Sequence, residues 1–219
     1  MKELVSSFEN SIFDQSLFDA GTDLLEIGID SVIDNPFVES LPIARIAFGA
    51  GKTVLNISER HFLKQTYAFL VAFNTGDIDK KAYEEYKNRI DSDPKKGEEE
   101  LGRVMIILNR SIEIKKAEIL GKLFQAYVCR KIDWEEFCDF SDALDRLFIS
   151  DIPLLINVLH EDIVNPEGKE AYKGDRLSAM GLVDTKTNFA ETTVDVINID
   201  RIIRITEFGR RFVQYGLSQ

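Results

Sequence analysis

The string GAGKT at residues 49–53 ends in the Gly-Lys-Thr tripeptide that closes a phosphate-binding loop. Such a loop needs another glycine five positions before the glycine of that tripeptide, because its backbone N–H groups wrap around phosphates between a strand and a helix. Position 46 is isoleucine, and Pro42 interrupts the stretch in which the strand would lie. We therefore interpret these small residues as a close contact between helices rather than as a nucleotide site.

The two histidines, His61 and His160, are not placed for catalysis. The sequence His-Glu-Asp at 160–162 is not a helical zinc motif, which needs a second histidine four residues after the first. Neither histidine has a cysteine or serine nucleophile motif beside it. We expect His61 to be a polar surface group near a helix start, and His160 to interact with the negative C-terminal end of a helix.

Acidic residues and cysteines also lack the spacing of a metal site. The run Glu-Glu-Glu at 98–100 falls at a predicted helix start, where each carboxylate stabilises the helix by about 0.3–1 kcal/mol. Cys129 and Cys138 match no common zinc spacing and are too few to cross-link a chain of 219 residues. We expect no catalytic residue, no metal or other cofactor, and a reducing, cytoplasmic location.

The chain is acidic, with 38 Asp and Glu against 27 Lys and Arg and a formal net charge of −11. Residues 1–40 contain nine acidic residues and one lysine, whereas residues 165–219 contain eight residues of each sign. An acidic surface disfavours general binding to nucleic acid, since phosphates must be neutralised by Lys and Arg. Because residues 165–219 are neutral, the net charge of the whole chain does not exclude DNA binding by this part.

No integral membrane span is expected. The longest apolar stretch, residues 41–57, is interrupted by Arg45 and Lys52 and is shorter than the roughly 20 residues that a membrane-spanning helix needs. The N-terminal residues lack the basic region and the following apolar segment of a signal peptide.

Apolar residues recur at helical intervals through the first part of the chain, which predicts an acidic helical bundle over residues 1–131. Its first two helices, at 11–33 and 42–57, form a hairpin that is broken at Asn35-Pro36. The helices predicted after this hairpin cover residues 59–74, 79–91, 98–110 and 112–130, with a loop at 91–97 and a break near Ser111.

From residue 132 the pattern changes to short helices and two strands. The helices are predicted at 134–148, 151–160 and 169–180, the strands at 192–199 and 202–205 with a turn at 200–201, and a last helix after Thr206. Asp133, Ser150-Asp151 and Thr206 are predicted to cap helices. This order is typical of a winged helix-turn-helix domain. The predicted fold class is therefore mainly α, with an N-terminal helical bundle followed by a winged helix-turn-helix module over residues 132–219 that contains one β-hairpin.

Two motifs, Leu177-x3-Gly-Leu-Val183 and Ile205-Thr-x2-Gly-x2-Phe212, resemble the end of many bacterial winged-helix domains. The stretch from Glu118 through Leu-Gly-Lys-Leu-Phe124 to Phe148 is similar to helical proteins grouped with the abortive-infection alpha family. Those proteins occur in bacteria and phages and combine a helical N-terminal part with a terminal winged-helix-like module. The resemblance covers about the last half of the chain and implies an antiviral setting.

The first functional hypothesis is a non-enzymatic protein-interaction or regulatory protein. The resemblance implies a role in bacterial phage defence or in phage counter-defence. The acidic N-terminal hairpin would bind a protein partner, or a second copy of the chain, through the side that carries Leu17, Leu24 and Gly28.

Two alternatives remain open. The first is a DNA-binding winged-helix regulator, although the third helix of the module and its approach carry charges that sum to zero, which favours protein contact over DNA. The basic residues that such a regulator would use are Lys169, Lys173, Arg176, Arg201 and Arg204. The second alternative is a membrane-active effector whose hairpin, residues 11–57, opens onto a bilayer.

Overall fold

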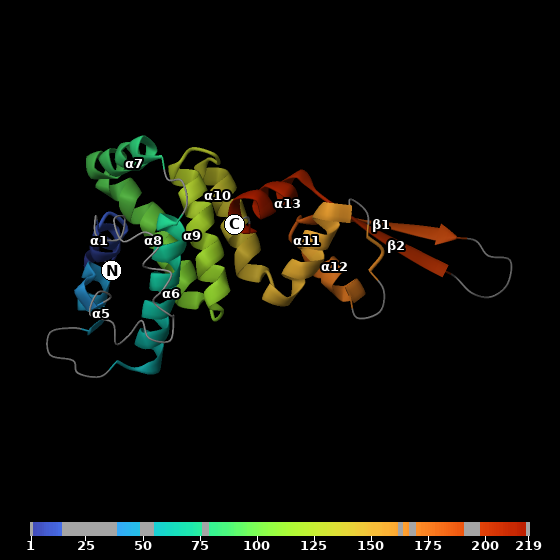
Figure 1. Ribbon diagram of the computed structural model, residues 1–219, viewed down its shortest axis with the longest axis horizontal. Coiled ribbons are helices and arrows are strands. Elements are labelled where there is room, and N and C mark those ends of the chain that lie inside the picture. The colour runs from blue at the N-terminus through green and yellow to red at the C-terminus, as the bar shows by residue number, and fades with distance from the viewer. Residues whose placement is uncertain are drawn as a thin grey trace. The chain divides into compact units, whose positions relative to one another are not determined.

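The computed structural model is mainly helical and contains one small antiparallel sheet of two strands (Figure 1). It describes residues 2–14, 39–48, 55–75, 79–161, 164–166, 170–190 and 198–217. The chain divides into two compact units, Met1–Ser141 and Asp142–Gln219. The division falls inside helix α10 (Trp134–Arg146), whereas the sequence predicts a domain boundary ahead of this helix.

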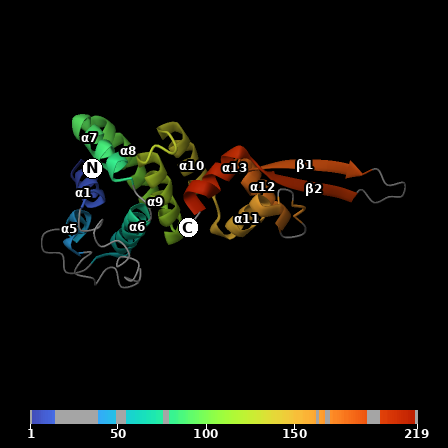
Figure 2. The same ribbon diagram turned by 45° about the horizontal axis from the view of Figure 1, so that its top comes forward.

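Unit 1 is a bundle of helices in which α6 (Ile57–Asn74) lies alongside α9 (Ile114–Val128), as Figures 1 and 2 show. The other helices of this unit are α1 (Lys2–Ile12), α5 (Pro42–Phe48), α7 (Lys80–Ser92), α8 (Pro94–Arg110) and the first part of α10. The predicted helices at 59–74 and 79–91 are confirmed within one or two residues. The break near Ser111 is also confirmed, because Ser111 is the C-cap of α8.

The loop predicted at 91–97 is wrong, because a single residue separates α7 from α8. The backbone N–H of Asp93 donates to the carbonyl of Arg89 at the end of α7. The side chain of the same residue accepts a hydrogen bond from the backbone N–H of Lys96, and Pro94 occupies the first turn of α8. Asp93 therefore ends one helix and begins the next, and proline is compatible with the helix start because its missing N–H would have no partner there.

Most of the predicted acidic hairpin lies outside the described residues, including Leu17, Leu24 and Gly28. The helix observed before it, α1, begins at Lys2 and ends at Ile12, so the predicted helix start at residue 11 is wrong. The predicted second arm begins as expected with α5. Ser11 connects α1 to α5, because its buried hydroxyl accepts a hydrogen bond of 2.9 Å from the backbone N–H of Ile43.

The core of unit 1 is aromatic. Phe69 and Phe73 of α6 contact Phe124 of α9, with ring centroids 5.8 and 5.7 Å apart, and all three side chains are buried. The two helices approach closely at Gly121, where an added Cβ would lie 2.5 Å from the carbonyl oxygen of Phe69. Glycine is therefore required by the packing of α9 on α6.

The described part of unit 2 contains the end of α10, a 3-10 helix, three short α-helices, a strand pair and a π-helical turn. The elements after α10 are η2 (Ile149–Asp151), α11 (Ile152–Glu161), α12 (Ala171–Ala179), β1 (Val183–Ala190), β2 (Asn198–Ile205), α13 (Glu207–Phe212) and η4 (Val213–Leu217). Thr206 is confirmed as the N-cap of α13, because its hydroxyl accepts from the backbone N–H of Gly209 at 2.8 Å.

The strands differ from those predicted. β1 covers residues for which no strand is predicted, Val183–Ala190, and the predicted turn residues Asp200 and Arg201 lie inside β2. Most of the strand predicted at 192–199 lies outside the described residues. The pairing of Val183 with Ile205 starts the ladder beside the core, where Val183 and Ile203 are buried. The sequence pattern identifies extended, β-branched segments. The register in which the strands pair is set by the residues that are buried against the core, and a local pattern does not show which these are.

Replacing Gly121 with alanine is expected to destabilise the protein by about 1–3 kcal/mol, because the methyl group forces α9 away from the backbone of α6. Gly102→Ala in α8 is the matched control, since no described atom lies within 4 Å of its added Cβ. Alanine there should be neutral or stabilise the helix by about 0.5–1 kcal/mol. Urea unfolding followed by circular dichroism measures both, and equal midpoints for the two variants would contradict the close helix contact.

Candidate functional site

Asp151 is a fully buried carboxylate of unit 2, placed at the end of η2 where α11 begins. Its two oxygens accept hydrogen bonds from Nε and Nη2 of Arg176 in α12, the first at 2.9 Å. The sequence predicts Asp151 as a helix cap, but its side chain is directed to this arginine. A buried carboxylate is unfavourable unless it is neutralised, so Arg176 is required at this position. The hydrogen bond that Arg176 donates to Asp151 raises the pKa of the guanidinium above its ordinary value.

The guanidinium of Arg176 also lies over two aromatic rings. Its Cζ is 4.2 Å from the ring centroid of Phe148 and 4.7 Å from that of Tyr172. Both rings are half exposed, at 51% for Phe148 and 49% for Tyr172. Of the five N–H donors of an arginine, Asp151 takes two, and the other three have no acceptor among the described residues. The arginine is held rigidly, yet retains donors for a ligand.

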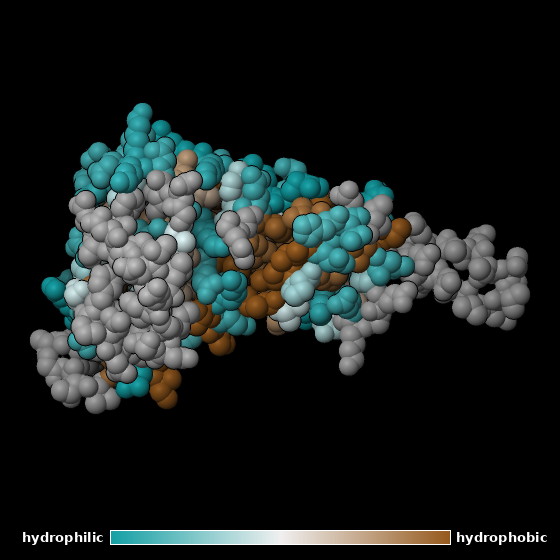
Figure 3. Space-filling model, in the orientation of Figure 1, coloured by the Kyte–Doolittle hydropathy of each residue, from teal (hydrophilic) through white to brown (hydrophobic). Residues whose placement is uncertain are grey.

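The helix that follows Asp151, α11, carries an apolar stripe beside its buried face. Ile152, Ile156 and Leu159 recur there at helical spacing, and Ile156 is 36% exposed. Figure 3 shows hydrophobic residues gathered over this helix. We name the surface formed by Phe148, Tyr172, Arg176 and this stripe the α11–α12 surface.

The basic residues predicted to bind DNA do not form one cluster in the described part of the chain. Arg176 is bound to Asp151, and Lys173 forms an ion pair with Glu170 at 3.4 Å. Arg204 is exposed on β2, opposite Asp184 of β1. The backbone of Arg201 also lies in β2, whereas Lys169 lies outside the described residues.

Sequence reasoning missed the two aromatic residues and the carboxylate of this surface. Phe148 was included in a helix predicted to end at residue 148, but α10 ends at Arg146. Tyr172 and Arg176 are four residues apart on one helix, a spacing that places two side chains on the same face and that could have identified them. The pairing of Asp151 with Arg176 joins residues 25 positions apart, and the sequence contains no local signal for it.

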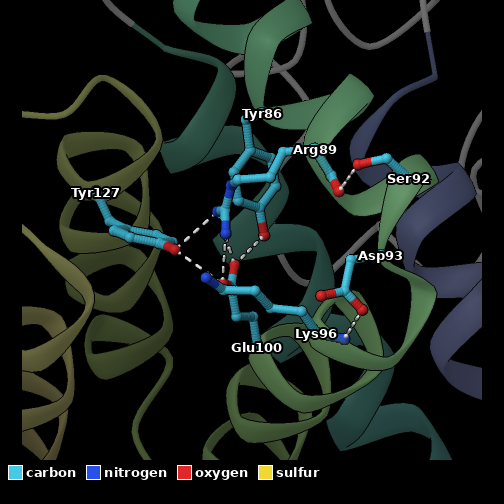
Figure 4. A network of polar contacts seen from close by, with 7 residues as sticks. All are labelled: Tyr86, Arg89, Ser92, Asp93, Lys96, Glu100 and Tyr127. Carbon is cyan, nitrogen blue, oxygen red and sulfur yellow. Dashed lines mark hydrogen bonds and ion pairs between the residues drawn. The ribbon is translucent and has the colours of Figure 1, made fainter.

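Unit 1 contains a second buried carboxylate, Glu100 of α8, which is 1% exposed. Figure 4 shows it surrounded by Tyr86, Arg89 and Tyr127. Its oxygens accept from Arg89 Nη1 and Nη2 at 2.8 and 3.0 Å, from the Tyr86 hydroxyl at 3.0 Å and from the Tyr127 hydroxyl at 2.9 Å. Arg89 also donates to the Tyr127 hydroxyl at 2.7 Å.

This cluster joins α7, α8 and α9, and the hydrogen bonds of the Glu100 carboxylate come from residues of the cluster itself. Burial, followed by the charge of Glu100, raises the pKa of both Tyr86 and Tyr127, so both phenols remain neutral donors. Burial lowers the pKa of Arg89, but hydrogen bonds and charge from Glu100 and Tyr127 raise it by more. Four donors occupy the carboxylate, which leaves it little capacity for a ligand, and we assign the cluster to stability.

His61 is not the surface group that the sequence predicts. It is half-buried, and its Nε2 lies 2.9 Å from the carbonyl oxygen of Ser111 and 3.1 Å from Nε2 of Gln65. The histidine therefore connects α6 to the segment between α8 and α9. His160 lies exposed in the last turn of α11, as expected.

No protein-family model matches this chain, and searches of curated proteins and of solved structures found no significant match. The resemblance to abortive-infection alpha proteins therefore stays a prediction. None of the described helices is long and apolar enough to cross a membrane.

Glu100→Gln is expected to reduce the free energy of unfolding by about 3 kcal/mol or more, because the amide cannot neutralise Arg89 and offers one acceptor oxygen where the carboxylate has two. Glu99→Gln, on the exposed neighbour in the same helix turn, should change it by less than about 0.5 kcal/mol. Chemical denaturation of both variants tests this difference. A small effect at both positions would show that the cluster does not hold the three helices together.

Raising the pH above 10 is expected to destabilise unit 1. Burial raises the pKa of Tyr67 to about 12, and raises the pKa of Tyr83, Tyr86 and Tyr127 in the same direction. In the unfolded chain these phenols ionise near pH 10, so their contribution is complete below that pH and is lost as the pH rises toward the folded values. A pH titration should follow tyrosinate absorbance and, by circular dichroism, helix content. Both signals should change over the same pH range. Ionisation of these four residues near pH 10 with intact helices would contradict the prediction.

Proposed function

We propose that the chain is a non-enzymatic protein-interaction protein, and that unit 2 binds a protein partner or a second copy of the chain through the α11–α12 surface. The observation that carries this proposal is the arginine held against two half-exposed aromatic rings by a buried carboxylate. Tyr, Trp and Arg are the residues most enriched among those that dominate binding energy in protein interfaces. The adjacent apolar stripe supplies surface that a partner would remove from water.

The arrangement of unit 2 supports the further proposal of a winged helix-turn-helix module. Its elements follow the order predicted for such a module, with α12 as the helix before the strand pair. In many modules of this kind the corresponding helix enters the DNA major groove. Here Asp151 neutralises Arg176 and Glu170 pairs with Lys173, which reduces the positive charge available to phosphates. We therefore favour a protein partner over DNA.

The biological setting proposed from the resemblance is phage defence or counter-defence. The acidic N-terminal segment, with Leu17, Leu24 and Gly28, remains a proposed second contact. Membrane activity of the hairpin likewise stays a prediction, because most of residues 11–57 lie outside the described residues.

Tyr172→Ala combined with Ile156→Ser is expected to weaken binding of the partner by about 30-fold or more, since exposed residues that dominate an interface contribute about 2 kcal/mol or more each. These substitutions leave Asp151 and Arg176 in place. Ile112→Ser in unit 1 is the matched control for removing an exposed apolar side chain, because Ile112 is 81% exposed. The double variant and the Ile112 variant should both unfold at nearly the same temperature as the wild type.

Two measurements test whether these substitutions weaken association. Sedimentation at increasing concentration tests self-association, and affinity capture with quantitative mass spectrometry tests a different partner. The unit 2 double variant should lose the associated species that the wild type and the Ile112 variant retain. Equal association by all three proteins, or a monomeric wild type that captures nothing, would overturn the proposal.

A further inference from the structure

The outer edge of β1 carries main-chain groups that no described residue pairs with. On the β2 side of the sheet, the N–H and C=O of Ile203 exchange hydrogen bonds of 2.9 and 3.1 Å with Val164, so both groups point away from β1. Hydrogen-bonded and non-hydrogen-bonded pairs alternate along an antiparallel ladder, and Ile203 lies opposite Thr185. The N–H and C=O of Thr185 therefore point to the free side of β1, as do those of Val183 and Thr187.

The two edges of this sheet are covered differently. Val164 forms a β-bridge with β2, whereas no described strand lies beside β1, which follows the outer side of the strand pair in Figure 2. Unpaired N–H and C=O groups at the edge of a sheet are a template for a further strand. A pair of strands is also of low stability by itself in water, and a sheet of three or more strands is more stable.

The charges of β1 indicate which strand fits its edge. Asp184 and Lys186 are exposed and share one face of the strand, because side chains alternate along it. Neither forms an ion pair with a described residue. When two copies of β1 pair in antiparallel orientation with Thr185 at the centre, Asp184 of each copy lies directly opposite Lys186 of the other. Asp184 then lies between this lysine and Arg204 of its own chain.

The neighbouring registers do not have this complementarity. A pairing centred on Asp184 places two aspartates opposite each other, and one centred on Lys186 places two lysines opposite each other. Like charges in directly opposite positions destabilise a strand pair, and opposite charges stabilise it. The charges of the strand therefore favour a second copy of β1, and they favour the register centred on Thr185.

The centre of this pairing also supplies a partner for a buried hydroxyl. Oγ1 of Thr185 is shielded from solvent and forms no hydrogen bond with the described residues. A buried hydroxyl without a hydrogen bond is unfavourable, because nothing replaces the water that it has lost. In the symmetric pairing the two Thr185 side chains lie directly opposite each other on one face, an arrangement in which threonine hydroxyls form hydrogen bonds.

We propose that two copies of the chain pair along β1, in antiparallel orientation and centred on Thr185, and form one continuous sheet of four strands. Main-chain hydrogen bonds join Val183 of one copy to Thr187 of the other, and Thr185 to its counterpart. Two ion pairs between Asp184 and Lys186 set the register. This interface uses no residue of the α11–α12 surface and does not depend on the function proposed for unit 2.

Sedimentation of the full chain over a range of concentrations measures the dimer, and charge reversal tests its register. Asp184→Lys and Lys186→Asp each place like charges opposite each other at two positions of the pairing, so each should weaken the dimer by about tenfold or more. A mixture of these two variants should form a heterodimer, because every lysine then faces an aspartate. Lys95→Asp, at an exposed position of α8, is the matched control and should dimerise like the wild type.

Hydrogen exchange at single residues of the wild type tests the edge itself. The N–H of Lys186 bonds to β2 within one chain, so it should be protected at every concentration. The N–H of Thr185 points outward and should be protected only at concentrations at which the dimer forms. Protection of Thr185 that does not depend on concentration would contradict the pairing.

Three further results would overturn the proposal: a wild type that stays monomeric, a charge variant that keeps the full dimer, or two charge variants that do not associate when mixed. Both substituted side chains are exposed, so circular dichroism should show the helix content of the wild type. The variant Tyr172→Ala with Ile156→Ser leaves β1 unchanged and should retain this dimer. Loss of partner capture by that variant, with the dimer retained, separates the α11–α12 surface from the β1 edge.

Discussion

Among the described residues, each compact unit buries one carboxylate, and in each unit an arginine that lies on aromatic rings neutralises it. Glu100 binds Arg89 in unit 1, and Asp151 binds Arg176 in unit 2. Removing a carboxylate from water costs several kcal/mol unless charge and hydrogen bonds replace the water. The helices that supply these partners must therefore meet at fixed positions: α7, α8 and α9 around Glu100, and α11 and α12 around Asp151.

The same chemical pair has different consequences in the two units because the surrounding rings differ. Tyr86 is buried, and Tyr86 and Tyr127 both donate to Glu100, so the unit 1 carboxylate is fully occupied and the cluster stabilises the bundle. Phe148 and Tyr172 are half exposed, and Arg176 retains donors, so the unit 2 pair lies at the surface that we propose to bind a partner. Pre-organisation of this kind reduces the entropy lost when a partner binds.

Local patterns predicted the helices well where capping and periodicity agree. Asp133 and Thr206 accept the expected backbone hydrogen bonds, and α10 and α13 begin beside them. The predicted loop at 91–97 is wrong because Asp93 ends α7 and also begins α8. Asp151 precedes α11, and its pairing with Arg176 of α12 has no local signal in the sequence. Propensity cannot distinguish such choices, because they are decided by contacts between distant residues.

The sequence by itself determined that the chain is mainly helical with a late β-hairpin, that its charge excess is N-terminal, and that helix caps lie at particular residues. These properties depend on neighbours within a few positions, so periodicity and composition report them. The tertiary structure alone decided the strand register, the burial of Asp151 and Glu100, and the exposure of Phe148, Tyr172, Ile57 and Ile112. Burial depends on which elements cover a side chain, and an apolar residue has the same sequence signature in a core as on a binding surface.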